Sequence, residues 1–253
     1  MFWDEPHEKS GLWEVTLHGW IAPLLAALCI VLSGGMAAAI DVKAAVLRVD
    51  YQTLLPISRY DLRPDDLGFA GAVLADEDNG TTGSFLGHTY ETTHVAVTPE
   101  EADAALTEII DAGTRLIIVL AKGEDLLRLS DAAAEAGALV LNAQAPDVAL
   151  RDDQCRGNLL HVAPSNAMKA DAVAQFAIWK RWRNWFVVGG SNPEDVELAN
   201  AYRKSARKFG AGVVVYRTFE DTGGSRRTDS GHVLVQRQLP MFMQDAPKHD
   251  VVI

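Results

Sequence analysis

The sequence predicts an α/β protein of two lobes, in which parallel sheets are flanked by helices. Short apolar runs alternate with helical patterns along most of its 253 residues, and the connections between them are short. One run, Arg115–Ala121 (RLIIVLA), is apolar throughout after its first residue, as expected of a central parallel strand buried on both faces. Two sets of such units are separated near Pro164, which predicts the two lobes.

The first set opens with a buried strand over Lys43–Val49. A helix over Leu67–Asp78 follows, begun by Pro64 and two acids and ended by Asn79-Gly80. His88–Val97 is rich in Thr, Tyr and Val, which favours a second strand.

Clearer start and stop signals mark the next units. Thr98-Pro99-Glu100-Glu101 begins a helix that Gly113 ends, because an N-cap, a proline and first-turn acids stand together. After the central strand, the pattern predicts a helix over Glu124–Glu135 closed by Gly137, a strand over Ala138–Asn142 and an extended segment over Leu159–Ala163.

The second set repeats this order. The predicted elements are a helix from Ser165-Asn166 to Trp182, a strand over Trp185–Val188, a helix from Asn192-Pro193 to Phe209 stopped by Gly210, a strand over Gly212–Tyr216, a helix over Gly231–Phe242 and a strand over Asp250–Ile253. The last apolar strand has no helix after it to cover it, so we expect a C-terminally truncated piece of a longer protein.

Residues 1–39 are expected to be a signal peptide or N-terminal extension. Trp20–Leu32 is uncharged but short for a membrane span, and small residues precede a cleavage position after Ala39. The segment before it is acidic rather than basic, so a retained anchor is the alternative. Residues 40–163 would then form lobe 1, and residues 164–253 would form an incomplete lobe 2.

Charge and cysteine content exclude several classes of function. The formal net charge is −11, and an acidic surface repels phosphate backbones, so no nucleic-acid partner is expected. Beyond residue 39 the only cysteine is Cys155, which we expect to be a buried or half-buried thiol without a catalytic or metal-binding role.

The candidate ligand site lies in the loops that follow the strands, because open parallel sheets bind ligands at the carboxyl ends of their strands. The candidate residues are Tyr51, Gln52, Ala121, Lys122, Gly123, Asn142, Ala143, Gln144, Ser191 and Asn192. Helix N-termini at Gly123 and Asn192 suit a carboxylate or another anionic group on a small solute. Ordinary turns and helix caps are the alternative reading of each residue.

No enzyme signature is found. Phosphate-binding glycine motifs and G-x-S-x-G are absent, so no catalytic residue, no cofactor and no metal is expected. His88 and His94 favour surface or sheet packing, and His161 a satisfied core histidine. Asp76, Glu77 and Asp78 indicate a solvated face. The aromatic residues at 179, 182, 185 and 186 favour core packing over an aromatic ligand wall.

The order of these elements resembles the type I periplasmic solute-binding proteins of branched-chain amino-acid ABC transporters. The resemblance rests on EEADAALTEIIDAG, LIIVLA and ALVLNAQAPDVALRD, and the segment Leu67–Gly87 with its D-N-G-T-T-G is most similar to a subgroup associated with PQQ-dependent alcohol catabolism. It implies sheets of 2-1-3-4-5 order, crossover strands as hinges and a ligand held between the lobes. Contacts from the loops at Ala121–Gly123 and Asn142–Gln144 are also implied.

The same resemblance implies a periplasmic, non-enzymatic protein that passes a small molecule to a membrane permease. Lys122 and Gln144 stand where amino-acid binders of this family usually carry Ser/Thr-rich loops, which leaves open a ligand of different charge or size. Two alternatives stay open. One is a periplasmic ligand sensor or accessory protein for a quinoprotein dehydrogenase, and the other is an enzyme on the same scaffold.

Overall fold

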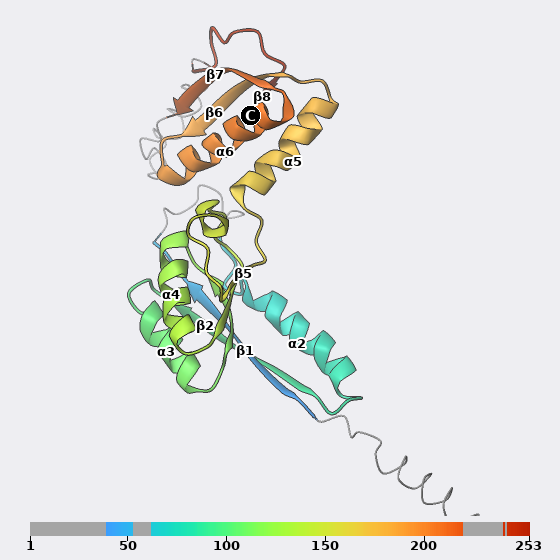
Figure 1. Ribbon diagram of the computed structural model, residues 1–253, viewed down its shortest axis with the longest axis vertical. Coiled ribbons are helices and arrows are strands. Elements are labelled where there is room, and N and C mark those ends of the chain that lie inside the picture. Colours follow the sequence, from blue (N-terminus) through green and yellow to red (C-terminus); the bar gives the residue numbers. More distant parts are fainter. Residues whose placement is uncertain (1–38, 53–61, 220–239, 241) are drawn as a thin grey trace, which may run out of the picture.

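The computed structural model describes residues 39–52, 62–219, 240 and 242–253, and they form two units, each built on its own parallel sheet (Figure 1). The first sheet has the order β2-β1-β3-β4-β5 and the second the order β7-β6-β8. The predicted α/β class and the 2-1-3-4-5 order of the first sheet are therefore confirmed.

The first unit has its core between this sheet and two helices. Its strands are β1 (Asp41–Val49), β2 (Thr89–Val97), β3 (Leu116–Leu120), β4 (Leu139–Asn142) and β5 (Leu159–His161). β3 is the middle strand, and Ile117 and Val119 are fully buried in the core, as its apolar sequence predicts.

Helices α3 (Ala102–Asp111) and α4 (Gly123–Glu135) lie together on one side of the first sheet, and α2 (Phe69–Gly83) lies on the other (Figure 1). Leu106 of α3 and Leu129 of α4 pack into the same core cluster. Gly113 and Gly137 end these helices with φ of 90° and 67°, a left-handed conformation that favours glycine.

The second unit has a smaller core. It contains α5 (Asn166–Trp179), β6 (Asn184–Gly190), α6 (Pro193–Phe209), β7 (Gly212–Phe219) and β8 (Val251–Val252). Trp185 and Val187 of β6 are buried against Ala177 of α5 and Ala199 of α6. Ser165 caps α5 by accepting a hydrogen bond from the Met168 amide at 3.2 Å, as the sequence predicts.

The start and end of α2 differ from the prediction. Residues 65–68 form a turn, and the helix begins at Phe69 after Gly68, whose φ is 84°. Asn79-Gly80 does not end the helix, because Gly80 keeps a helical backbone and Thr81 donates a hydrogen bond to the Glu77 carbonyl at 2.9 Å. The exit comes after Gly83, with Gly87 in the left-handed region.

The sequence predicts a solvated face at Asp76, but in the structure this side chain bonds to the neighbouring strand. It is half-buried, and its carboxylate accepts hydrogen bonds from the Thr92 amide at 3.0 Å and hydroxyl at 2.8 Å. It therefore fastens α2 to β2, while Glu77 and Asp78 are exposed as predicted.

Helix α5 ends at Trp179 rather than at Trp182. Arg181 has a φ of 65°, its amide donates to the Ile178 carbonyl, and the Trp182 amide donates to Ala177, which is a Schellman end without glycine. The aromatic cluster is divided as a result: Trp185 and Phe186 are core residues, whereas Trp179 is 72% exposed. Core packing was the wrong prediction for Trp179 and for Trp182, which is 37% exposed.

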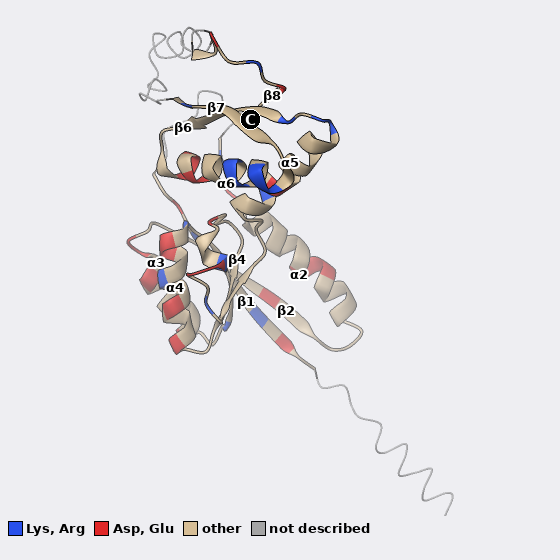
Figure 2. Cartoon of the chain, turned by 45° about the horizontal axis from the view of Figure 1, so that its top comes forward, with Lys and Arg blue, Asp and Glu red and all other residues tan. Residues whose placement is uncertain are grey.

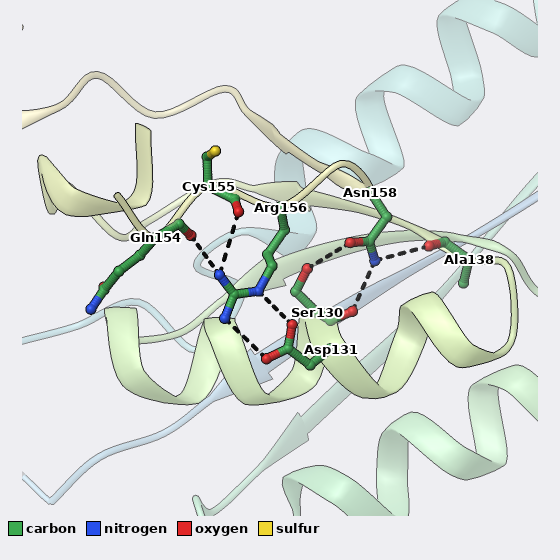
Figure 3. A network of polar contacts seen from close by, with 7 residues as sticks. All are labelled: Ser130, Asp131, Ala138, Gln154, Cys155, Arg156 and Asn158. Carbon is green, nitrogen blue, oxygen red and sulfur yellow. Dashed lines mark hydrogen bonds and ion pairs between the residues drawn. The ribbon is translucent and has the colours of Figure 1, made fainter. Parts of the chain in front are cut away.

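Cys155 is exposed, which corrects the prediction of a buried thiol. It lies in the connection between the short 3-10 helix η2 (Ala149–Arg151) and β5, which two contacts tie to α4 (Figure 3). Arg156 forms an ion pair with Asp131 at 2.6 Å, and Asn158 donates to the Ser130 carbonyl at 2.8 Å.

Two predictions lie outside the described residues: the signal peptide or extension, apart from its last residue, and nearly all of the helix over 231–242. Within the residues that the structure describes, no helix combines the length and apolar character that a membrane span requires.

Candidate functional site

A cavity of about 390 Å³ lies where the carboxyl ends of β3 and β4 meet the first turns of α5 and α6. The first unit contributes the loops after β3 and β4, and the second contributes α5 and α6. The residues that line it are Ala121, Lys122, Gly123, Gln144, Ala145, Pro146, Asp147, Asn166, Lys169, Glu194, Asp195, Glu197 and Leu198.

The Tyr51 hydroxyl holds the loop after β3 in place through two hydrogen bonds. Its hydroxyl donates to Asp125 at 2.5 Å and accepts from the Lys122 amide at 2.9 Å, and the Lys122 ammonium lies 5.1 Å from its ring centre. Burial and the hydrogen bond to Asp125 raise the pKa of the Tyr51 hydroxyl, so it stays a donor at neutral pH. Burial alone would raise the pKa of Asp125, but hydrogen bonds from Tyr51 and Arg128 hold it below its ordinary value.

Asn142 organises the loop after β4. Its side chain is fully buried; its Oδ1 accepts from the amides of Gln144 at 3.0 Å and Ala145 at 2.8 Å, and its Nδ2 donates to the Ala145 carbonyl at 2.8 Å. The same Nδ2 lies 3.0 Å from Nδ1 of His161. Asn142 therefore holds the loop in shape and does not face the cavity.

Two contacts join the first unit to α6 beside the cavity. The Lys122 ammonium forms an ion pair with Glu194 at 2.8 Å, and the Val148 amide donates to the Glu197 carboxylate at 3.3 Å. Figure 2 shows the acidic residues at the start of α6, with the basic residues in its later turns. The acidic end of α6 thus faces the first unit.

Carboxylates of the protein lie beside both helix N-termini that were predicted to attract an anion. A β-carbon at Gly123 would lie 2.8 Å from the Asp147 carboxylate, so this carboxylate covers the first turn of α4. At α6, the Asp195 carboxylate lies against Gly190 and accepts from Asn192 Nδ2 at 3.2 Å. The electrostatic preference of these N-termini for negative charge is already met from within the chain.

Of the ten residues predicted for the site, the structure brings four to the cavity: Ala121, Lys122, Gly123 and Gln144. Tyr51, Asn142 and Ala143 lie behind the cavity wall, where the Ala143 amide donates to the Val119 carbonyl. Gln52, Ser191 and Asn192 are exposed and are not among the lining residues.

Sequence reasoning missed most of the charged lining. Asp147 follows the predicted loop by only three residues, while Glu194 and Asp195 were interpreted only as first-turn acids of a helix. Lys169 and Glu197 gave no signal in the sequence, since each lies inside a helix with ordinary polar spacing. The described residues hold no group of three or more side chains suited to bind a metal ion.

A family model described as "Periplasmic binding protein" matches residues 70–229. No curated protein matches the chain. Among solved structures, an ABC transporter substrate-binding protein from Desulfitobacterium hafniense in complex with Leu is 18% identical with a TM-score of 0.57, and the match covers 80% of this chain and 56% of that protein.

Two further structures have the same fold. A branched-chain amino acid ABC transporter periplasmic ligand-binding protein from Burkholderia xenovorans is 15% identical with a TM-score of 0.60 and matches over 83% of this chain and 60% of its own. A leucine-, isoleucine-, valine-, threonine- and alanine-binding protein from Brucella ovis is 17% identical with a TM-score of 0.57. The match covers 84% of this chain and 53% of that protein. The chain thus spans little more than half the length of these proteins.

Proposed function

This chain belongs to the periplasmic binding protein family, and from that membership we propose that it binds a small solute in the cavity between its two units as the substrate-binding component of an ABC-type transporter. Proteins of this family bind their solutes and do not convert them. The proposed location is the periplasm, and export through residues 1–39 is part of the proposal.

The observation that carries the proposal is the composition of the cavity wall. Loops after two parallel strands of the first unit and the first turns of two helices of the second unit contribute to one space of about 390 Å³. This is the place where open parallel sheets bind ligands, and its volume suits a small molecule. A site shared by two units closes and opens when the units move relative to each other.

The proposal divides the chain into lobe 1, residues 40–163, and lobe 2, residues 164–253. Separate sheets and separate hydrophobic cores support this division. The segment between β5 and α5, around Pro164, would be one of the hinges. The proposed ligand contacts are Lys122, Gly123 and Gln144 from lobe 1, together with α5 and α6 residues from lobe 2.

The solute class is proposed as amino-acid-like or related to alcohol catabolism, and the partner as a membrane permease. The amino-acid class draws support from the solved relatives, one of which is in complex with Leu. The link to PQQ-dependent alcohol catabolism draws support only from the segment Leu67–Gly87. That segment forms α2 and its flanking turns, and none of its residues lines the cavity.

A thermal-shift screen of the protein against amino acids, short alcohols, their acids and metal ions tests the proposal. A solute that binds the folded state adds RT ln(1 + [L]/Kd) to its stability, about 2.7 kcal/mol at roughly a hundredfold excess over Kd. Mass spectrometry should recover the bound solute unchanged. Chemical conversion of a stabilising solute, or no stabilisation by any compound of a broad solute library, would contradict solute binding without catalysis.

A further inference from the structure

Three backbone amides in the loops that line the cavity already donate to side chains of the protein. Asn142 Oδ1 accepts from the amides of Gln144 and Ala145, and the Tyr51 hydroxyl accepts from the amide of Lys122. These three amides belong to the two loops that line the cavity from the first unit. A ligand carboxylate would have to displace one of these side chains to reach them.

The charged side chains of the cavity wall favour a positive rather than a negative group on the ligand. Four carboxylates line it, Asp147, Glu194, Asp195 and Glu197, against the two ammonium groups of Lys122 and Lys169. Glu194 already neutralises Lys122 at 2.8 Å. Asp147, Asp195 and Glu197 form no ion pair within the described part of the chain. Four carboxylates and two ammonium groups give the side chains of the wall a formal net charge of −2.

Resting on the proposed function, we infer that the solute of this cavity carries a net positive charge: an amine whose carboxylate is absent or blocked. Its ammonium group replaces water at Asp147 and Glu197, one carboxylate from each unit. Opposite charges at the cavity wall and on the ligand attract, and the attraction strengthens as closure removes water. An anionic or zwitterionic solute would bring its carboxylate against this acidic wall, where the amides of Lys122, Gln144 and Ala145 already donate to side chains of the protein.

Calorimetry with three ligands of the same side chain separates the charge classes. Leucinamide is a cation, leucine a zwitterion and isocaproate an anion. We expect leucinamide to bind about tenfold or more tightly than leucine, isocaproate to give no binding heat, and the leucinamide affinity to fall with added salt. Leucine or isocaproate binding as tightly as leucinamide would overturn the inference and leave solute binding itself intact.

Matched variants locate the effect. Asp147→Asn and Glu197→Gln keep the shape of each side chain and remove its charge, and each should weaken leucinamide binding about tenfold. Asp153→Asn and Glu135→Gln remove the same charge from exposed positions outside the cavity and should leave the affinity unchanged. If all four variants weakened leucinamide binding equally, the net charge of the protein would explain the effect. The assignment of the ammonium group to Asp147 and Glu197 would then be overturned.

Failure of this inference differs from failure of the proposed function. A neutral or anionic solute found by the screen, with no cation bound, overturns only the charge class. Absence of any bound solute overturns solute binding itself.

Discussion

The Lys122 ammonium lies 2.8 Å from the Glu194 carboxylate, so one ion pair connects the residue before α4 to the first turn of α6 across the candidate cavity. Both side chains are more than half exposed, at 54% and 76%. A second contact joins the units at the cavity, since the Asn166 amide donates to the Pro146 carbonyl at 2.7 Å. Because both side chains of the ion pair are exposed, the pair can contribute little to the free energy of unfolding.

Lys122→Met should lower the free energy of unfolding by less than about 1 kcal/mol, because exposed ion pairs are screened by water and salt. Glu194→Gln should have a similarly small effect, and the double variant should show a coupling of about 0.5 kcal/mol that disappears in molar salt. Urea denaturation of the four proteins measures this cycle. A coupling that persists in molar salt would show that the pair is far less exposed than its position indicates.

Asn142→Asp should lower the free energy of unfolding by about 2–4 kcal/mol, because a buried carboxylate would replace two hydrogen-bond donations, to the Ala145 carbonyl and to His161. Asn79→Asp, on the exposed side of α2, is the control and should stay within about 0.5 kcal/mol of the wild type. Chemical denaturation compares the two. Equal, small effects would mean that Asn142 does not hold the loop after β4.

His161 should make the protein less stable in mild acid. Burial and the nearby Arg151 guanidinium lower the pKa of His161, and the neutral ring satisfies both of its contacts by accepting from Asn142 at Nδ1 and donating to the Leu150 carbonyl from Nε2. The unfolded state then binds more protons, so this contribution is complete above about pH 6.5 and is lost as the pH falls toward the lowered pKa.

Urea midpoints between about pH 8 and pH 5 measure this dependence, and His161→Gln should flatten it. His88→Gln, at the residue before β2, is the matched control against which the slope of His161→Gln is compared. A slope unchanged by His161→Gln would assign the acid sensitivity to other groups.

Trp185→Ala should lower the free energy of unfolding of the second unit by about 3–5 kcal/mol, because it leaves a large cavity in the small core around β6. Trp179→Ala removes the same side chain from a position that is 72% exposed and should cost less than about 1 kcal/mol. Thermal unfolding followed by far-UV circular dichroism compares them. Comparable losses would contradict the assignment of Trp179 to the surface.

The elements of the fold could be predicted where the signal is local. Apolar runs gave the strands, and the glycines at 113, 137 and 210 mark the helix ends where the backbone turns left-handed. The sheet order came from the family resemblance, since strand order depends on contacts that periodicity does not encode. The end of α5 escaped prediction because Arg181, a residue with no special turn preference, takes the left-handed position.

The site could be predicted only in part, because tertiary contacts decide which polar side chains face the cavity. Loops after parallel strands are recognisable in sequence, which explains why the predicted residues Lys122, Gly123 and Gln144 line the cavity. Whether a polar residue faces the ligand or the protein depends on its tertiary partners, and Asn142 faces His161 and its own loop. Glu197 reaches the cavity only because α6 lies beside the loop after β4.

The central claim is that a solute binds between the two units, and blocking that space tests it most directly. Gln144→Trp places a large side chain on the cavity wall, while Gln154→Trp places the same side chain at an exposed position outside it. Titration calorimetry with the solute from the screen should show binding to the wild type and to Gln154→Trp, and at least about a hundredfold weaker binding to Gln144→Trp. Equal affinity of all three proteins would contradict the claim.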